Sequence, residues 1–113
     1  MRKRLLCLWM LIPLFGHPQD LQTPFETSGG KQTATYPQCI AFYQQLDKLS
    51  PLVKIREMGM SDVGFPYHVV LYCNDGSYDP QTWHRHGKVV ILINNGIHPG
   101  EPDGIDASMM LIR

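Results

Sequence analysis

The chain has 113 residues, of which 43% are hydrophobic and 18% are charged, so its size and composition fit one globular domain and not a disordered chain. Ten Lys and Arg side chains balance ten Asp and Glu side chains, which excludes a strongly basic nucleic-acid-binding protein. No apolar run reaches the roughly 18 residues of a membrane span, and three cysteines are too few for a disulfide scaffold.

Residues 1–16 have the layout of a secretory signal peptide. Arg2–Arg4 form a positive segment, Leu5–Phe15 form an apolar segment, and Gly16 offers a small residue near a cleavage point. The alternative is an N-terminal core helix, against which Pro13 argues. We therefore expect a secreted or periplasmic protein.

Removal of residues 1–16 would leave seven positive against ten negative side chains. We therefore expect no nucleic-acid partner, and no stable membrane span after signal cleavage. The two remaining cysteines, Cys39 and Cys73, could form a disulfide in an oxidising compartment or could be two buried thiols.

Residues 17–35 are predicted to be a linker or the mature N-terminal segment, because their Pro and Gly residues interrupt any regular hydrophobic period. Residues 36–113 are predicted to begin a folded domain. A helix is expected from Pro37 to Leu49, with Thr35 or Tyr36 as its cap. Its apolar side chains recur at helical spacing and indicate one buried face.

Three strands are predicted to follow this helix. Val53–Met60 alternates between its two faces, and Tyr67–Cys73 is rich in residues that favour strands. Residues 74–87 are predicted to be a long polar loop. Lys88–Asn94 contains a continuous apolar run, which is typical of a strand buried on both faces. A last helix is expected to begin at Pro102.

This order of elements predicts an α/β protein. We expect the N-terminal portion of a three-layer α/β/α fold with a mixed central sheet, because a doubly buried strand needs neighbours on both sides and helices on both faces. The chain offers at most three strands and two helices for this purpose. The sequence is therefore interpreted as the N-terminal part of a longer protein.

The candidate site follows the third predicted strand. His98 and Glu101 lie three residues apart in a loop directly before a predicted helix, and open α/β sheets bind ligands at the carboxyl ends of their strands. An imidazole nitrogen and a carboxylate oxygen are two of the three protein ligands of a His₂Glu zinc site. Pro99 and Pro102 would stiffen the loop, and Gly100 would let it bend. The spacing alone also fits an ordinary structural histidine.

The wider segment Asn94–Gly104 resembles the first zinc-binding motif of the zinc carboxypeptidase family of metallopeptidases. The helix over Tyr36–Leu49 is similar to the helix that opens that domain, and residues 59–66 resemble the turn between the family's first two strands. The resemblance covers residues 33–113. It implies that the central sheet is the one found in zinc carboxypeptidases.

By this resemblance, His98 and Glu101 are the first two ligands of Zn²⁺. The third ligand, a His, and the catalytic Glu that acts as general base are expected beyond Arg113, and the four other histidines match neither role. The implied full-length protein is a zinc metallocarboxypeptidase. Its hydrolase activity, a form of proteolysis, removes C-terminal residues from peptides or proteins with a free C-terminus by attack of a zinc-activated water. The fragment alone is expected to be inactive.

One residue departs from the family pattern. Digestive carboxypeptidases have an Arg immediately before the ligand Glu, and this chain has Gly100 there. The sequence therefore does not determine which substrate side chain the full-length protein prefers. A related zinc deacylase, a cell-wall peptide amidase and a non-catalytic truncated product remain alternatives.

Other patterns could also bind metals. His84 and His86 form an H-x-H pair that fits either a metal site or an exposed loop, and residues 74–79 resemble a calcium loop without its final Glu. Asp103 and Asp106 could support His98, or could simply favour the start of a helix.

Overall fold

The computed structural model describes residues 21–98 and 100–113. The elements are α1 (Pro24–Thr27), α2 (Tyr36–Leu49), β1 (Val53–Met60), β2 (Pro66–Tyr72), α3 (Pro80–Arg85) and α4 (Asp103–Ile112). The protein is thus a mixed α/β structure, as predicted. The proposed signal peptide of residues 1–16 lies outside the described residues.

Helix α2 confirms the prediction for this part of the chain. The side chain of Gln38 accepts hydrogen bonds from the backbone N–H of Thr35 at 2.9 Å and from the Thr35 hydroxyl at 2.8 Å, so the first turn is closed by its cap. Pro37 occupies the first turn, where its missing N–H costs nothing. The helix ends at Leu49, directly before Ser50-Pro51.

Strands β1 and β2 form an antiparallel hairpin, and both predicted strands are confirmed to within a residue at their ends. Val53 pairs with Tyr72, and the register shifts between Glu57 and Gly59. The turn is held by Ser61, whose backbone N–H donates to the carbonyl of Phe65 at 2.8 Å. The sheet of the described residues has two strands.

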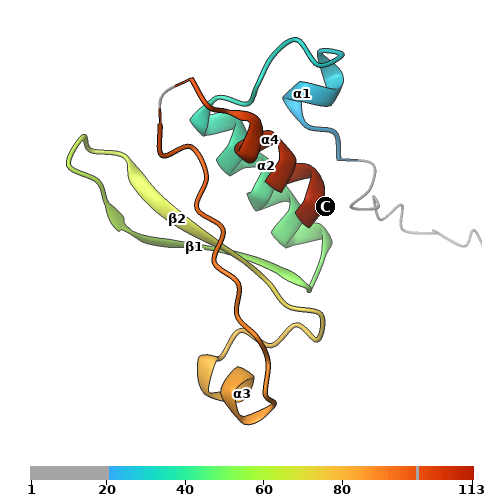
Figure 1. The fold of residues 1–113 in the computed structure, drawn as a ribbon, viewed down its shortest axis with the longest axis vertical. Helices are drawn as coiled ribbons and strands as arrows, with labels where there is room; N and C mark the ends of the chain where they lie inside the picture. The colour runs from blue at the N-terminus through green and yellow to red at the C-terminus, as the bar shows by residue number, and fades with distance from the viewer. Residues whose placement is uncertain (1–20, 99) are drawn as a thin grey trace, which may run out of the picture.

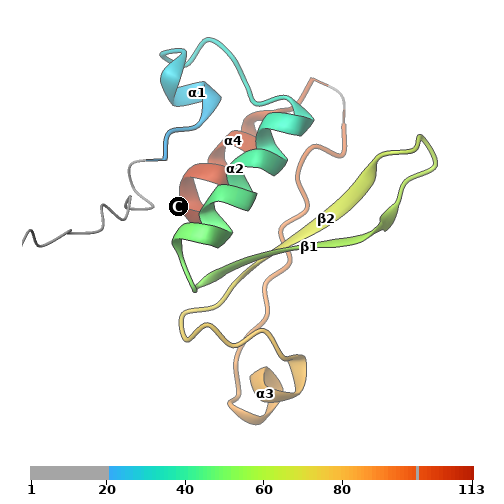
Figure 2. The ribbon, with the colours of Figure 1, turned by 180° about the vertical axis from the view of Figure 1, so that it is seen from behind.

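The core lies where α2 contacts both β1 and α4. Figures 1 and 2 show α4 lying along α2, with the hairpin on another side of α2. Leu46 and Met109 are 1% and 0% exposed, so α2 and α4 each place a fully buried side chain in this layer. The buried cluster consists of Ala34, Phe42, Tyr43, Leu46, Val53 and Met109.

The segment predicted as a linker packs against α4. It contains the one-turn helix α1, in which the Thr23 hydroxyl and the Glu26 carboxylate cap each other's backbone N–H groups. The Glu26 carboxylate also accepts two hydrogen bonds from the Arg113 guanidinium, each 2.7 Å long. These bonds hold the pKa of Glu26 at about 2, well below its ordinary value.

The third predicted strand is the main difference between prediction and structure. Residues 88–94 are extended but belong to no strand, and their apolar side chains are exposed. The prediction of a strand buried on both faces over Lys88–Asn94 is wrong for this structure. A strand requires hydrogen bonds to a neighbouring backbone, and among the described residues this segment makes no such pairing, although the end of β2 lies near it.

The predicted polar loop over residues 74–87 is interrupted by helix α3. The Asp79 carboxylate accepts a hydrogen bond from the backbone N–H of Thr82 at 2.9 Å, and Pro80 follows it in the first turn. Figures 1 and 2 show α3 at the opposite end of the molecule from α1, with a long extended segment running from α3 to α4. Among the described residues no helix has the length and apolar character to cross a membrane.

Both described cysteines are free thiols. Cys73 is buried directly after β2, and Cys39 is half-buried on α2. Burial raises the pKa of the Cys39 thiol, because a thiolate loses hydration there. Of the two alternatives that the sequence left open, the structure therefore shows the thiols and not the disulfide.

Candidate functional site

His98 and Glu101 meet in the loop before α4. The imidazole Nδ1 of His98 lies 3.1 Å from the carboxylate Oε2 of Glu101. The backbone also turns here, with the N–H of Glu101 donating to the carbonyl of His98 at 3.4 Å. Both side chains are exposed, at 66% and 70%. The structure thus brings together the two residues that the sequence selected, on an open surface.

Gly100 makes this meeting possible. Its φ of 85° lies in the left-handed region, which a residue with a Cβ adopts only with strain. An Arg at this position would carry that strain, so the turn itself explains why glycine stands there. Pro99, which we expected to stiffen the loop, lies outside the described residues, and Pro102 is the N-cap residue of α4.

The start of this loop is held against α4. The amide nitrogen of Asn95 donates to the hydroxyl of Ser108 at 2.5 Å. Gly96 has a φ of 67°, and a Cβ on it would come within 2.8 Å of the Cδ1 atom of Ile105. A Cβ on Gly104 would likewise meet the Asn95 side chain at 2.5 Å. Gly96 in the loop and Gly104 on α4 therefore allow the loop to approach the helix closely at Asn95 and Gly96, just before His98.

The loop offers two zinc donors but not a complete site. Two donors of one tetrahedral zinc lie roughly 3.3–3.6 Å apart, given metal–ligand distances of about 2.0–2.2 Å. The observed 3.1 Å between Nδ1 and Oε2 is a direct hydrogen bond, and a small separation of the two side chains would reach that range. A catalytic zinc needs three protein ligands. The described residues contain no group of three or more His, Cys, Asp and Glu side chains able to hold a metal ion. These residues alone therefore do not form a catalytic zinc centre.

Asp106 has a partner other than His98. This carboxylate is 5% exposed and accepts a hydrogen bond from the backbone N–H of Ala34 at 3.3 Å. It ties the first turn of α4 to the segment before α2. Asp103 also lies in that first turn, where the helix dipole favours a negative charge.

A second polar cluster surrounds Cys73. The ammonium of Lys88 lies 2.6 Å from the Asp75 carboxylate and donates to the Cys73 sulfur at 3.0 Å. The thiol in turn donates to Asp75 at 3.0 Å. The Lys88 ammonium holds the pKa of Asp75 well below its usual range. The sequence did not predict this cluster, because the contact of Lys88 with Cys73 and Asp75 depends on how the chain folds between residues 75 and 88.

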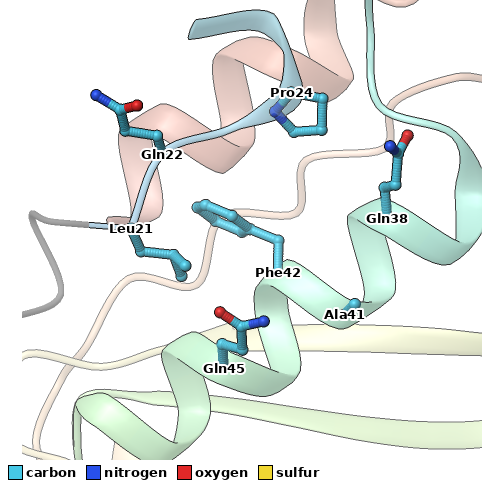
Figure 3. A pocket seen from close by; sticks show the side chains of 7 residues that line it. All are labelled: Leu21, Gln22, Pro24, Gln38, Ala41, Phe42 and Gln45. Carbon is cyan, nitrogen blue, oxygen red and sulfur yellow. The ribbon is translucent and has the colours of Figure 1, made fainter. Parts of the chain in front are cut away.

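In the described part of the chain, two pockets lie away from the His98–Glu101 loop. One, of about 200 Å³, lies between α2 and the segment before α1 and is shown in Figure 3. Its walls are apolar side chains and neutral amides, so it has no group able to transfer a proton at neutral pH. It is lined by Leu21, Gln22, Pro24, Gln38, Ala41, Phe42 and Gln45.

The other pocket, of about 150 Å³, lies between the end of β2 and the extended segment that begins at Lys88. His84 and His86 lie elsewhere, at the carboxyl end of α3.

Comparison of the chain with protein-family models, with curated proteins and with solved structures finds no match. The functional interpretation therefore depends on the motif and its geometry.

Proposed function

We propose that the chain is the N-terminal part of a zinc-dependent metallocarboxypeptidase, in which His98 and Glu101 are the first two metal ligands. The observation that supports this proposal most is the 3.1 Å separation of the two donor atoms, in a loop that leads directly into a helix. Exposure of both side chains leaves them accessible to a metal ion and to a substrate. The third ligand and the general base would come from residues beyond Arg113.

In the complete protein, we propose a three-layer α/β/α fold with a mixed central sheet. The contacts of α2 with β1 and of α4 with α2 give the two packed layers from which such a fold begins. Zinc, when bound, would supply a water of lowered pKa and polarise a peptide carbonyl. In this proposal, the described residues hold the metal in an exposed loop, and Gly96 and Gly100 determine the shape of that loop.

The alternative of a zinc deacylase or cell-wall peptide amidase is favoured by one observation. Gly100 stands where digestive carboxypeptidases have an Arg, and its φ of 85° is a conformation that an Arg would adopt only with strain, so digestive-type substrate contacts are not expected from this position. Residues outside the described chain would distinguish these hydrolases.

A zinc titration of the chain, followed through the NMR signals of its five imidazoles, tests the proposed half-site. We expect the His98 signals to respond at lower zinc concentrations than those of the other four histidines. Glu101→Gln should weaken this response at least about tenfold, because a neutral amide is a poor zinc ligand. Binding should be weak, since only two ligands are present.

The matched controls are Glu57→Gln, which changes an exposed carboxylate on β1, and His84→Ala, which removes one half of the H-x-H pair. Both should leave the His98 response unchanged. A His98 response that survives Glu101→Gln would contradict the proposal, as would a first response at His84 and His86.

A further inference from the structure

A cysteine, a lysine and an aspartate meet just beyond the end of β2, and the proposed zinc site uses none of them. The Lys88 ammonium donates to the Cys73 sulfur at 3.0 Å and lies 2.6 Å from the Asp75 carboxylate. The Cys73 thiol in turn donates to Asp75 at 3.0 Å. Cys73 and Lys88 are 15 residues apart in the sequence, so the fold brings the sulfur and the nitrogen into contact.

The surroundings of the Cys73 sulfur suit a reacting thiol. A thiolate is the nucleophile in thiol chemistry, and a lysine ammonium beside it stabilises its negative charge. When the Cys73 thiol gives up its proton, the sulfur faces the Lys88 ammonium and not apolar side chains alone. The Asp75 carboxylate holds that ammonium in place.

Small reagents have access to this sulfur. Cys73 and Lys88 both line the pocket of about 150 Å³ between the end of β2 and the extended segment. About 10–15 Å³ of such space holds one water molecule, so hydrogen peroxide, with its two oxygen atoms, fits. Cys73 is only 7% exposed, which keeps larger reagents from the sulfur. The position therefore favours a small oxidant.

We propose that Cys73 and Lys88 form a peroxide-sensitive pair, in which hydrogen peroxide oxidises Cys73 to a sulfenic acid and Lys88 then captures the sulfur as a sulfenamide cross-link. The proposal does not depend on the zinc site. In the first step the thiolate sulfur attacks one peroxide oxygen and the O–O bond breaks. The other oxygen leaves as hydroxide and takes up a proton to become water. Sulfur loses two electrons, and peroxide gains them.

The second step needs no further oxidant. The Lys88 ammonium gives one proton to solvent through the Asp75 carboxylate, and the free amine forms a bond to the sulfur. The S–O bond breaks, and the hydroxyl leaves as water with a second proton from the nitrogen. Sulfenic acids condense with a backbone nitrogen in the same way. The Lys88 nitrogen is well placed for this reaction, since it already contacts the sulfur.

Treatment of the chain with hydrogen peroxide, followed by mass spectrometry of its proteolytic fragments, tests this inference. The wild-type chain should give a linked pair of peptides containing Cys73 and Lys88, two hydrogens lighter than their sum, and dithiothreitol should separate them. Cys39 is the comparison within the chain, because it is more accessible but burial raises the pKa of its thiol. We expect Cys73 to be oxidised at least about tenfold faster than Cys39.

Two variants at position 88 separate the two steps. Lys88→Arg keeps the positive charge but has no nucleophilic amine, so dimedone should trap the Cys73 sulfenic acid and no cross-link should form. Lys88→Met also removes the charge and should slow the oxidation of Cys73 at least about tenfold. Lys54→Arg is the matched control, since Lys54 is an exposed lysine paired with Asp47, and it should form the cross-link like the wild type.

Three results would overturn the proposal. One is a wild-type chain that forms no link between Cys73 and Lys88 under peroxide. Another is oxidation of Cys39 before Cys73, which would show that exposure and not the lysine contact decides the reactivity. The third is a Lys88→Met variant whose Cys73 is oxidised as fast as in the wild type.

Discussion

Replacement of Leu46 by alanine is expected to lower the free energy of unfolding by about 2–5 kcal/mol. Leu46 is 1% exposed and lies in the cluster where α2 meets β1 and α4. The shortened side chain leaves a cavity lined by neighbours such as Phe42 and Met109, which lose contacts that no solvent replaces. Native proteins are stable by only about 5–15 kcal/mol, so this loss is a large fraction of the total stability. Urea denaturation followed by circular dichroism measures this loss.

Leu49→Ala is the control for this change, because it makes the same substitution three residues later on the same helix. Leu49 is 37% exposed, so it has less apolar surface to lose to water. We expect a loss of less than about 1 kcal/mol. Equal losses for the two variants would show that α2 does not bury the face that the structure assigns to it.

Gly96→Ala is expected to lower the free energy of unfolding by about 2–4 kcal/mol, because two costs act together. The left-handed φ of 67° is unfavourable for alanine by about 1–2 kcal/mol. The added Cβ also lies 2.8 Å from the Cδ1 atom of Ile105 on α4, so the loop or the helix must move. Thermal unfolding gives the stability, and the His98 NMR signals report the displacement of the loop.

Gly64→Ala separates the two costs, since Gly64 has a φ of 79° and no atom within 4 Å of the added Cβ. Gly64→Ala should lower the free energy of unfolding only by the cost of the left-handed backbone conformation, about 1–2 kcal/mol. Adding Ile105→Val to Gly96→Ala removes the Cδ1 atom and should recover part of the loss. If Gly96→Ala costs no more than Gly64→Ala, the loop does not pack against α4 as described.

Local signals were sufficient to predict α2, the strands β1 and β2 with the turn between them, and the start of α4. A capping threonine, a proline in the first turn and alternating side chains act within a few residues, so one sequence is enough to read them. The same signals mark α1 and α3 but were not used. Thr23 and Glu26 form a capping box, and Asp79 precedes Pro80 as a helix cap does.

The prediction for Lys88–Asn94 failed for a different reason. Its apolar run indicates what the segment would bury, but burial depends on neighbours that a sequence pattern cannot place. In the described structure Val89–Leu92 therefore remain on the surface. The extended backbone that the pattern favoured is present without its hydrogen-bonded partner.

The candidate site was predicted in part. The H-x-x-E spacing indicated that His98 and Glu101 could face one point, and the two side chains do meet. The contact between Asn95 and Ser108 could not be predicted, because it depends on how closely the loop approaches α4. Metal binding at the meeting point remains a proposal.

The most direct test of the proposed function is peptide hydrolysis by the chain expressed together with whatever its reading frame adds beyond Arg113. The substrates are a peptide with a free C-terminus and the same peptide with an amidated one. We expect release of the C-terminal residue from the free peptide only, inhibition by a zinc chelator, and loss of activity in His98→Ala and Glu101→Gln but not in His84→Ala. A reading frame that ends at Arg113, or hydrolysis that survives the loss of His98, would contradict the account.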